Sequence, residues 1–313
     1  MRLRTLPSGP IMAQRATGLA PDTPPDVALR RIVAQCHADL LKYRAVAMRS
    51  RRPIGIHQTR VALRRLRAAF SLFKSAVDGP VVRGLAAEAK WLAGECGPAR
   101  DLYVFLNESV EAVPPIVKRV ANRLAATHLE RARTALSGAR FESFRRQLEA
   151  FMALPGADSG CRLDEFARAV LDERYDKVMR RGRKLASLDS ERLHRLRIAI
   201  KKLRYAAGFM RPAFASSQVK PYIEATAHLQ NALGAMNDGA VAAHMLADLA
   251  MAARPTEELR PALKELSAQV KGGNKRRWRK VEEAWAEFVA VPCFWRPQPG
   301  RIEPGASMKE SSE

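Results

Sequence analysis

The chain has 313 residues, and its 54 lysines and arginines outnumber 32 aspartates and glutamates, giving a net charge of +22. A hydrophobic content of 47% supplies enough apolar surface for a large core, so disorder throughout the chain is excluded. Arginine provides 40 of the 54 cations, and its planar group grips phosphate by two-point hydrogen bonding. The composition therefore indicates a polyanion as partner.

The first 26 residues are basic and rich in proline, and they lack the apolar stretch of a secretory signal. We predict a disordered tail over residues 1–26, with an organellar transit peptide as the alternative, and a second disordered tail over residues 297–313. The sequence contains no run of 18 apolar residues, so it predicts no membrane span. The cysteines lie far apart and form no C-x-x-C motif, which disfavours a zinc or disulfide framework and favours a reducing, cytoplasmic location.

Between the tails, apolar residues recur at steps of three and four, which predicts helices and no strands. The expected helices cover residues 27–50, 57–77, 81–96, 101–112, 115–136, 140–153, 163–187, 191–211, 217–233, 239–252, 257–271 and 275–290. Residues 154–160 contain proline and two glycines without apolar periodicity, and they predict a linker. This linker divides a first helical half, 27–153, from a second, 161–296.

The two halves carry the same motif. The sequence HQTRVALRRLR begins at His57, and HRLRIAIKKLR begins 137 residues later at His194. The same offset pairs Gly97 with Gly234 and Asp101 with Asp238. We therefore predict an all-α fold of two antiparallel helical bundles, which arise from an internal duplication and are related by a pseudo-two-fold axis.

At about 100° per residue, one side of the first motif helix carries Arg60, Arg64, Arg67 and Lys74, and one side of the second carries Arg197, Lys201, Arg204 and Arg211. Each of these stripes lies opposite a wide apolar face. Such a line of like charges destabilises an isolated helix, and a bound polyanion would offset that cost; the plain alternative is a solvated face. A two-fold axis would bring both stripes to one cationic groove. The predicted binding residues are His57, Arg60, Arg64, Arg65, Arg67, Lys74, His194, Arg197, Lys201, Lys202, Arg204 and Arg211.

The repeated pattern H-x-x-R-[VI]-A-[LI]-[RK]-[RK]-L-R, with an aspartate 44 residues after its histidine, resembles the CHAD domain, a conserved-histidine α-helical domain. The resemblance covers about residues 27–296. It implies two pseudo-symmetric bundles, binding of inorganic polyphosphate on a basic central surface, and association with polyphosphate granules. The second motif departs from the first by having lysine at 201 and 202, and Asn237 stands where the first half has Arg100. The 26 preceding residues lack the E-x-E-x-K strand of the triphosphatase domain that some family members carry.

Other functions stay open on the sequence alone. RNA or DNA is the main alternative ligand, because its phosphates would meet the same charges, although only Tyr205 lies near a stripe to stack on bases. A scaffold for granule-associated or acidic proteins is a third class. The first motif also faintly resembles the phosphoacceptor helix of sensor kinases, but no nucleotide-binding segment accompanies it.

Catalysis would need a nucleophile or an acid–base pair, and the repeats offer only two histidines and two aspartates besides their cations. These four could ligate a metal, but the neighbouring cations would repel a divalent ion. We expect a binding protein that is not an enzyme and has no metal or cofactor. The histidines should be neutral and position their helices, and the aspartates should cap helices that restart after Gly97 and Gly234, or pair with arginines.

Overall fold

The computed structural model describes residues 18–50, 54–105, 113–156, 160–214, 217, 219–252, 259–271 and 274–296. Helices joined by turns make up these residues, and no strand occurs among them, so the predicted all-α class is confirmed. The first half contains α1 (Pro25–Arg49), α2 (Ile54–Leu72), α3 (Pro80–Glu95), α4 (Gly97–Val104), α5 (Pro115–Ser137) and α6 (Ala139–Ala153).

The second half contains α7 (Leu163–Gly182), the short 3-10 helix η2 (Leu185–Ser187), α8 (Ser190–Met210), the 3-10 helix η3 (Arg211–Ala213), α9 (Val219–Ala252), α10 (Leu259–Lys271) and α11 (Asn274–Ala290). Local chemistry explains several helix starts. Prolines occupy the first turns of α1, α3, α4 and α5, where a missing N–H costs nothing. Asp189 caps α8, because its carboxylate accepts a hydrogen bond of 2.7 Å from the backbone N–H of Arg192.

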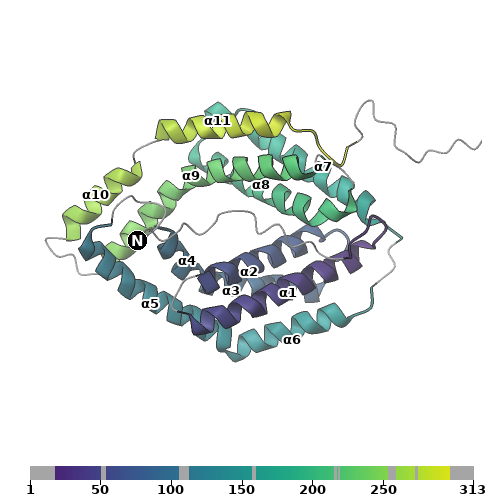
Figure 1. Cartoon of the computed structure of the whole chain (residues 1–313), viewed down its shortest axis with the longest axis horizontal. Helices are drawn as coiled ribbons and strands as arrows, with labels where there is room; N and C mark the ends of the chain where they lie inside the picture. The colour runs from purple at the N-terminus through teal and green to yellow at the C-terminus, as the bar shows by residue number, and fades with distance from the viewer. Residues whose placement is uncertain are drawn as a thin grey trace, which may run out of the picture.

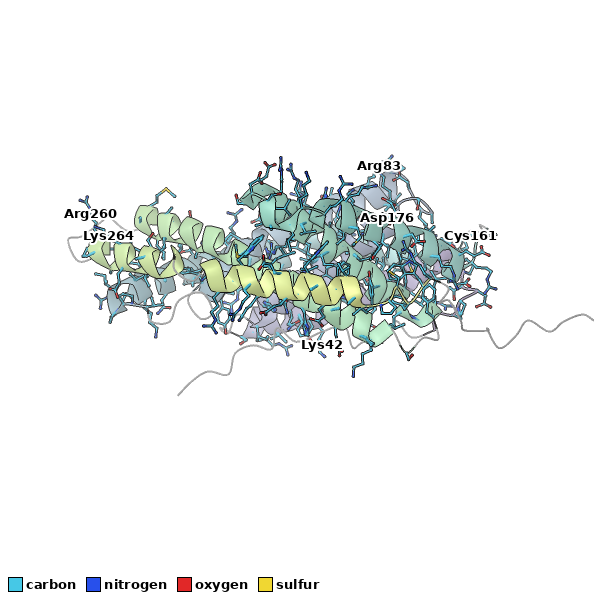
Figure 2. All side chains as sticks on the ribbon, turned by 90° about the horizontal axis from the view of Figure 1, so that it is seen from above. Lys42, Arg83, Cys161, Asp176, Arg260 and Lys264 are labelled. Carbon is cyan, nitrogen blue, oxygen red and sulfur yellow. The ribbon has the colours of Figure 1, made fainter. Side chains whose placement is uncertain are left out.

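The two halves lie against each other (Figure 1). Helices α1, α2, α3 and α6 form one side of the molecule, α7, α8, α9 and α11 form the other, and α2 contacts α8 between them. Helices α5 and α10 meet at one end. A view from above places Arg260 and Lys264 of α10 at that end and Cys161 at the opposite end (Figure 2).

The hydrophobic core joins the halves. One cluster includes Leu29 and Leu63 from the first half and Leu203 and Phe288 from the second. A second cluster packs α4 and α5 against α9 and α10. The predicted boundary at residues 154–160 therefore separates the halves along the chain but does not separate their cores; residues 157–159 of it lie outside the described part.

Several helix ends differ from the prediction by a few residues, and two differences are larger. Residues 18–26, assigned to the disordered tail, are ordered: Leu19 and Thr23 are buried, and the N–H of Asp164 donates to the carbonyl of Pro21 at 3.0 Å. The break predicted between residues 233 and 239 is also wrong, because α9 continues from Val219 to Ala252. Residues 1–17 and 297–313 lie outside the described part.

Each half places its motif on a helix that follows and packs against the first helix of that half: α2 follows α1, and α8 follows α7. This likeness is what a duplication would produce. The duplication and its two-fold axis stay predictions.

Candidate functional site

The first motif lies on α2, and its apolar residues decide which side of the helix faces water. Leu63, Leu66 and Phe70 are buried in the core. Arg64 and Arg67 are exposed on the other side, and Arg60 is half-buried. The stripe predicted from helical periodicity therefore points out of the first half.

The second motif lies on α8 in the same way. Leu196, Ile200 and Leu203 are fully buried, and Arg197, Lys201 and Arg204 are half-buried. We call the six basic residues of the two helices the central cationic patch. It consists of Arg60, Arg64 and Arg67 on α2 and Arg197, Lys201 and Arg204 on α8.

Electrostatics show that the two stripes converge. Burial lowers the pKa of Lys201 most, and together with the positive charges of Arg64, Arg197 and Arg67, in that order, brings it to about 8. The pKa of Arg204 is also lowered, chiefly by burial and in part by Arg64 across the helix pair. Within the described residues, no carboxylate forms an ion pair with Arg64, Arg67 or Lys201. The patch is therefore a concentration of positive charge that a bound anion would stabilise.

Each half places a glycine beside the first arginine of its motif. The side chain of Arg60 donates to the carbonyl of Ala93 at 2.6 Å, and a Cβ added at Gly97 would lie 2.8 Å from Nη1 of Arg60. A Cβ at Gly234 would lie 3.9 Å from Nε of Arg197. Glycine at 97 therefore makes room for Arg60, and the contact at Gly234 is looser.

The two motif histidines differ in their surroundings. Burial lowers the pKa of His57 to about 4, and Arg100, Arg64 and Arg60 contribute to the shift in that order. His57 is therefore neutral near pH 7, as we expected from its cationic neighbours. His194 is exposed. The roles of both histidines in helix positioning stay predictions.

Asp101 pairs with Arg100, whose Nη1 lies 3.0 Å from its Oδ1. The expectation of an arginine partner is confirmed, but the expectation of a helix cap is wrong, since Asp101 lies inside α4, which starts at Gly97. The side chain of Asp238 lies outside the described part. Across the described residues, no group of three or more His, Cys, Asp or Glu side chains could hold a metal ion.

Four predicted site residues lie away from the patch. The structure contradicts the prediction that Arg65 binds the ligand. This residue is 7% exposed and its Nη1 lies 2.8 Å from Oδ2 of Asp39 on α1, so its charge stabilises the core contact of α1 and α2. Lys74 and Lys202 line a separate hollow of about 520 Å³. Arg211 lies beyond the end of α8, in η3.

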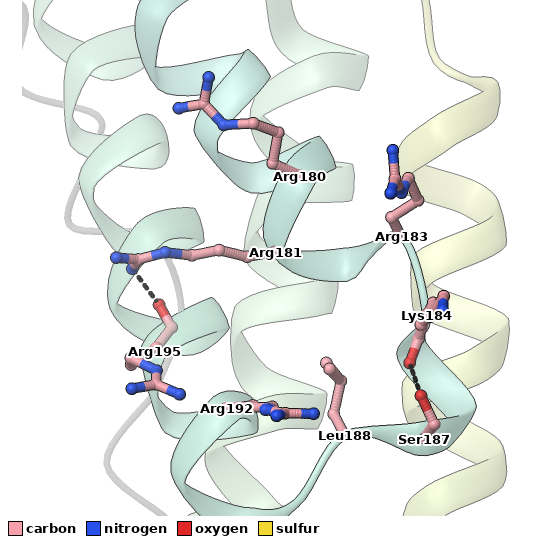
Figure 3. A pocket seen from close by; sticks show the side chains of 8 residues that line it. All are labelled: Arg180, Arg181, Arg183, Lys184, Ser187, Leu188, Arg192 and Arg195. Carbon is pink, nitrogen blue, oxygen red and sulfur yellow. Dashed lines mark hydrogen bonds between the residues drawn. The ribbon is translucent and has the colours of Figure 1, made fainter.

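The sequence reasoning missed a second group of basic residues. Arg180, Arg181, Arg183 and Lys184 end α7 and lead into η2, and they line a hollow with Arg192 and Arg195 of α8 (Figure 3). The run RRGRK over residues 180–184 was the available signal. The sequence reasoning also missed Arg100, which lies beside His57. The available signal was the difference between Arg100 in the first half and Asn237 at the matching position of the second.

Comparisons with known proteins fit this geometry. A solved structure described as the CHAD domain from the plant Ricinus communis superposes with a TM-score of 0.76 at 25% sequence identity, covering 89% of this chain and 97% of that one. A structure described as PptA from Streptomyces chartreusis superposes with a TM-score of 0.57 at 17% identity, covering 86% and 99%, and so shares the fold. A comparison with proteins of curated function gives no match.

Within the described residues, no helix has the length and apolar character needed to cross a bilayer. The sequence model of the CHAD domain matches residues 31–247, a range that contains α2, α8 and the whole central cationic patch. The chain therefore belongs to the CHAD domain family.

Proposed function

We propose that this protein binds inorganic polyphosphate along the central cationic patch and that it does so without turning the ligand over. The observation that carries the proposal is the convergence of α2 and α8, which gathers six cations where Lys201 has a pKa of about 8. A chain of linked phosphates would return favourable charge contacts along both helices. Membership in a family associated with polyphosphate binding supports the same ligand.

The shape of the charged surface favours an extended ligand. From Arg60 to Arg67, α2 rises by about 10 Å at about 1.5 Å per residue, and Arg197 to Arg204 gives the same span on α8. Two rows of this length suit several consecutive phosphates better than one small anion. Arginine forks would bind the phosphate oxygens in pairs. Targeting to polyphosphate granules in the cytoplasm would follow from this binding.

Nucleic acid remains the alternative ligand. Binding of single strands usually adds base stacking on exposed aromatic rings. Tyr205 is 5% exposed and stacks on Phe209 with ring centroids 6.1 Å apart, so its ring packs inside the second half. This arrangement favours a ligand that offers phosphate alone.

Titration calorimetry over a salt series would test the proposal with polyphosphate and single-stranded RNA of matched length. Arg64→Glu/Arg67→Glu reverses two exposed charges of the patch, and Arg260→Glu/Lys264→Glu makes the same net change on α10. We expect polyphosphate binding with a log–log salt slope on the order of −4, based on about 0.7 per neutralised phosphate. The patch variant should lose at least tenfold in affinity, and the α10 variant should lose much less.

Three results would contradict the proposal. Equal affinity losses in the two variants would show that net charge, not the patch, governs binding. RNA binding as tight as polyphosphate binding at every salt concentration would make nucleic acid an equal ligand. Release of orthophosphate from polyphosphate by the purified protein would overturn the proposal that it is not an enzyme.

A further inference from the structure

The second basic surface lies along α7 and α8 and reaches the end of α2. One hollow of about 410 Å³ is lined by Arg180, Arg181, Arg183, Lys184, Ser187, Leu188, Arg192 and Arg195 (Figure 3). A neighbouring hollow of about 520 Å³ is lined in part by Lys74, Arg174, Lys177 and Lys202, and it shares Arg181 and Arg195 with the first. Because the hollows share two residues, they form one continuous surface, which we call the lateral basic track.

Helix α8 separates the lateral basic track from the central cationic patch. With His194 at 0° and about 100° per residue, Arg195 and Lys202 point to about 100° and 80°. Arg197, Lys201 and Arg204 point to about 300°, 340° and 280°. The basic residues of the two surfaces therefore point at least about 100° apart around α8, the helix that both surfaces use.

Two arginines of the track are fixed by hydrogen bonds to backbone carbonyls. Arg181 donates to the carbonyl of Arg195 at 2.7 Å. Arg174 donates to the carbonyl of Ser71 at 3.1 Å and to that of Lys202 at 3.3 Å, and so links α7 to the end of α2 and to the middle of α8. A guanidinium carries five N–H donors, so these contacts position the group and leave donors for a ligand.

The track has few negative charges of its own. Glu173 lines it, Glu191 pairs with Arg195 at 2.9 Å, and Asp189 pairs with Arg192 at 3.5 Å. In the described part of the chain, no carboxylate forms an ion pair with Arg180, Arg183, Lys184 or Lys177. The pKa of Lys202 is lowered by burial and then by Arg174, Lys177 and Arg181, which confirms how closely the cations are gathered.

The lining also indicates the class of ligand. In the smaller hollow, only Ser187 and Leu188 are uncharged, and among the described residues that line either hollow there is no aromatic side chain on which a nucleobase could stack. A single small anion would use one hollow and leave the other cations unpaired. The continuous series from Lys74 to Lys184 matches an extended chain of phosphates.

We propose that the lateral basic track binds a second stretch of polyphosphate, so that one protein molecule bridges two chains. This inference rests on the proposed function of the central cationic patch, and it adds a second, independent contact. A protein with two separated sites crosslinks long polyphosphate, because each chain also offers many sites. Crosslinking of this kind would condense protein and polyphosphate into particles.

The test uses the full-length protein and three variants. Arg180→Ser/Arg183→Ser/Lys184→Ser removes three charges from the track, and Arg64→Glu/Arg67→Glu disables the patch. Arg260→Ser/Lys264→Ser/Arg279→Ser removes three exposed charges elsewhere and serves as the matched control. Thermal unfolding of each variant confirms that it is folded. Calorimetry with short-chain polyphosphate gives the stoichiometry, and light scattering with long-chain polyphosphate reports crosslinking.

We expect two short chains per protein for the wild type and the control, and one for each of the other variants. Scattering with long chains should fall at least tenfold in the track variant and remain in the control. If the wild type binds one short chain and only the patch variant loses this binding, the lateral site is refuted and the proposed function stands. Binding lost in the track variant but kept in the patch variant would refute the central site instead. RNA of equal length binding the track as tightly would overturn polyphosphate as its ligand.

Discussion

Replacing Lys201 by methionine should make the free protein more stable and the polyphosphate complex weaker. Lys201 has its pKa lowered from 10.5 to about 8 because burial and three arginines oppose its charge. That change corresponds to about 3 kcal/mol between the charged and neutral forms in the folded protein. Since the amine keeps some contact with water, screening reduces the figure, and we expect a gain of about 1–2 kcal/mol at pH 7.

The pH dependence follows from the direction of the shift. Below pH 8, Lys201 is charged in both folded and unfolded protein, so the full cost of its charge destabilises the fold. Between pH 8 and 10.5, it loses its proton in the folded state first, and the cost shrinks. The stabilisation by methionine should therefore be complete at pH 7 and fall to less than half at about pH 9.5.

Urea unfolding at both pH values measures the stability, and calorimetry measures polyphosphate affinity. Lys264→Met is the control, because Lys264 is exposed on α10 at one end of the molecule. We expect Lys201→Met to bind several-fold more weakly and Lys264→Met to behave like the wild type in both assays. A Lys201→Met protein that is less stable than the wild type at pH 7 would refute the argument that the patch stores unfavourable charge.

Three further predictions concern the fold around the site. Asp39→Ala should lower the free energy of unfolding in urea by about 3 kcal/mol, because it leaves the charge of Arg65 buried without its partner at 2.8 Å. Asp78→Ala, in the exposed pair with Arg83, should change the free energy of unfolding little. Equal effects would contradict the burial of Arg65. His57→Gln should reduce the loss of stability as pH falls from 6.5 towards 4. In this interval the histidine gains a proton in the unfolded chain, whereas His57 stays neutral in the fold, where its pKa is about 4. An unchanged slope of stability against pH would show that His57 titrates normally. Gly182→Ala should lower the free energy of unfolding by on the order of 2 kcal/mol, because the added Cβ would meet the ring of Trp285. Gly84→Ala, where the added Cβ meets open space, should raise it by up to about 1 kcal/mol. A Gly182→Ala protein as stable as the wild type would show that α7 and α11 pack less closely.

The sequence predicted the helical class and most helix positions because apolar periodicity reports local geometry. It failed at α9, where Gly234 suggested a break but the helix continues to Ala252. A glycine costs about 1 kcal/mol inside a helix, and the contacts of α9 with α8 and α11 outweigh that cost. It failed also at residues 18–26, where Leu19 and Thr23 are buried in contacts that no local pattern reveals.

By itself, the sequence determined the repeated motif, the side of α2 and α8 that is basic, and the excess of arginine. Only the tertiary structure decided what each charge does. Arg64 and Arg65 are neighbours of the same type, yet Arg64 is exposed in the patch, whereas Arg65 is buried and pairs with Asp39 of α1. Lys201 joins the patch, and Lys202 turns to α7 and the lateral basic track. The physical reason is that periodicity fixes a direction around one helix axis, while the charges that a side chain meets come from other helices far away in sequence.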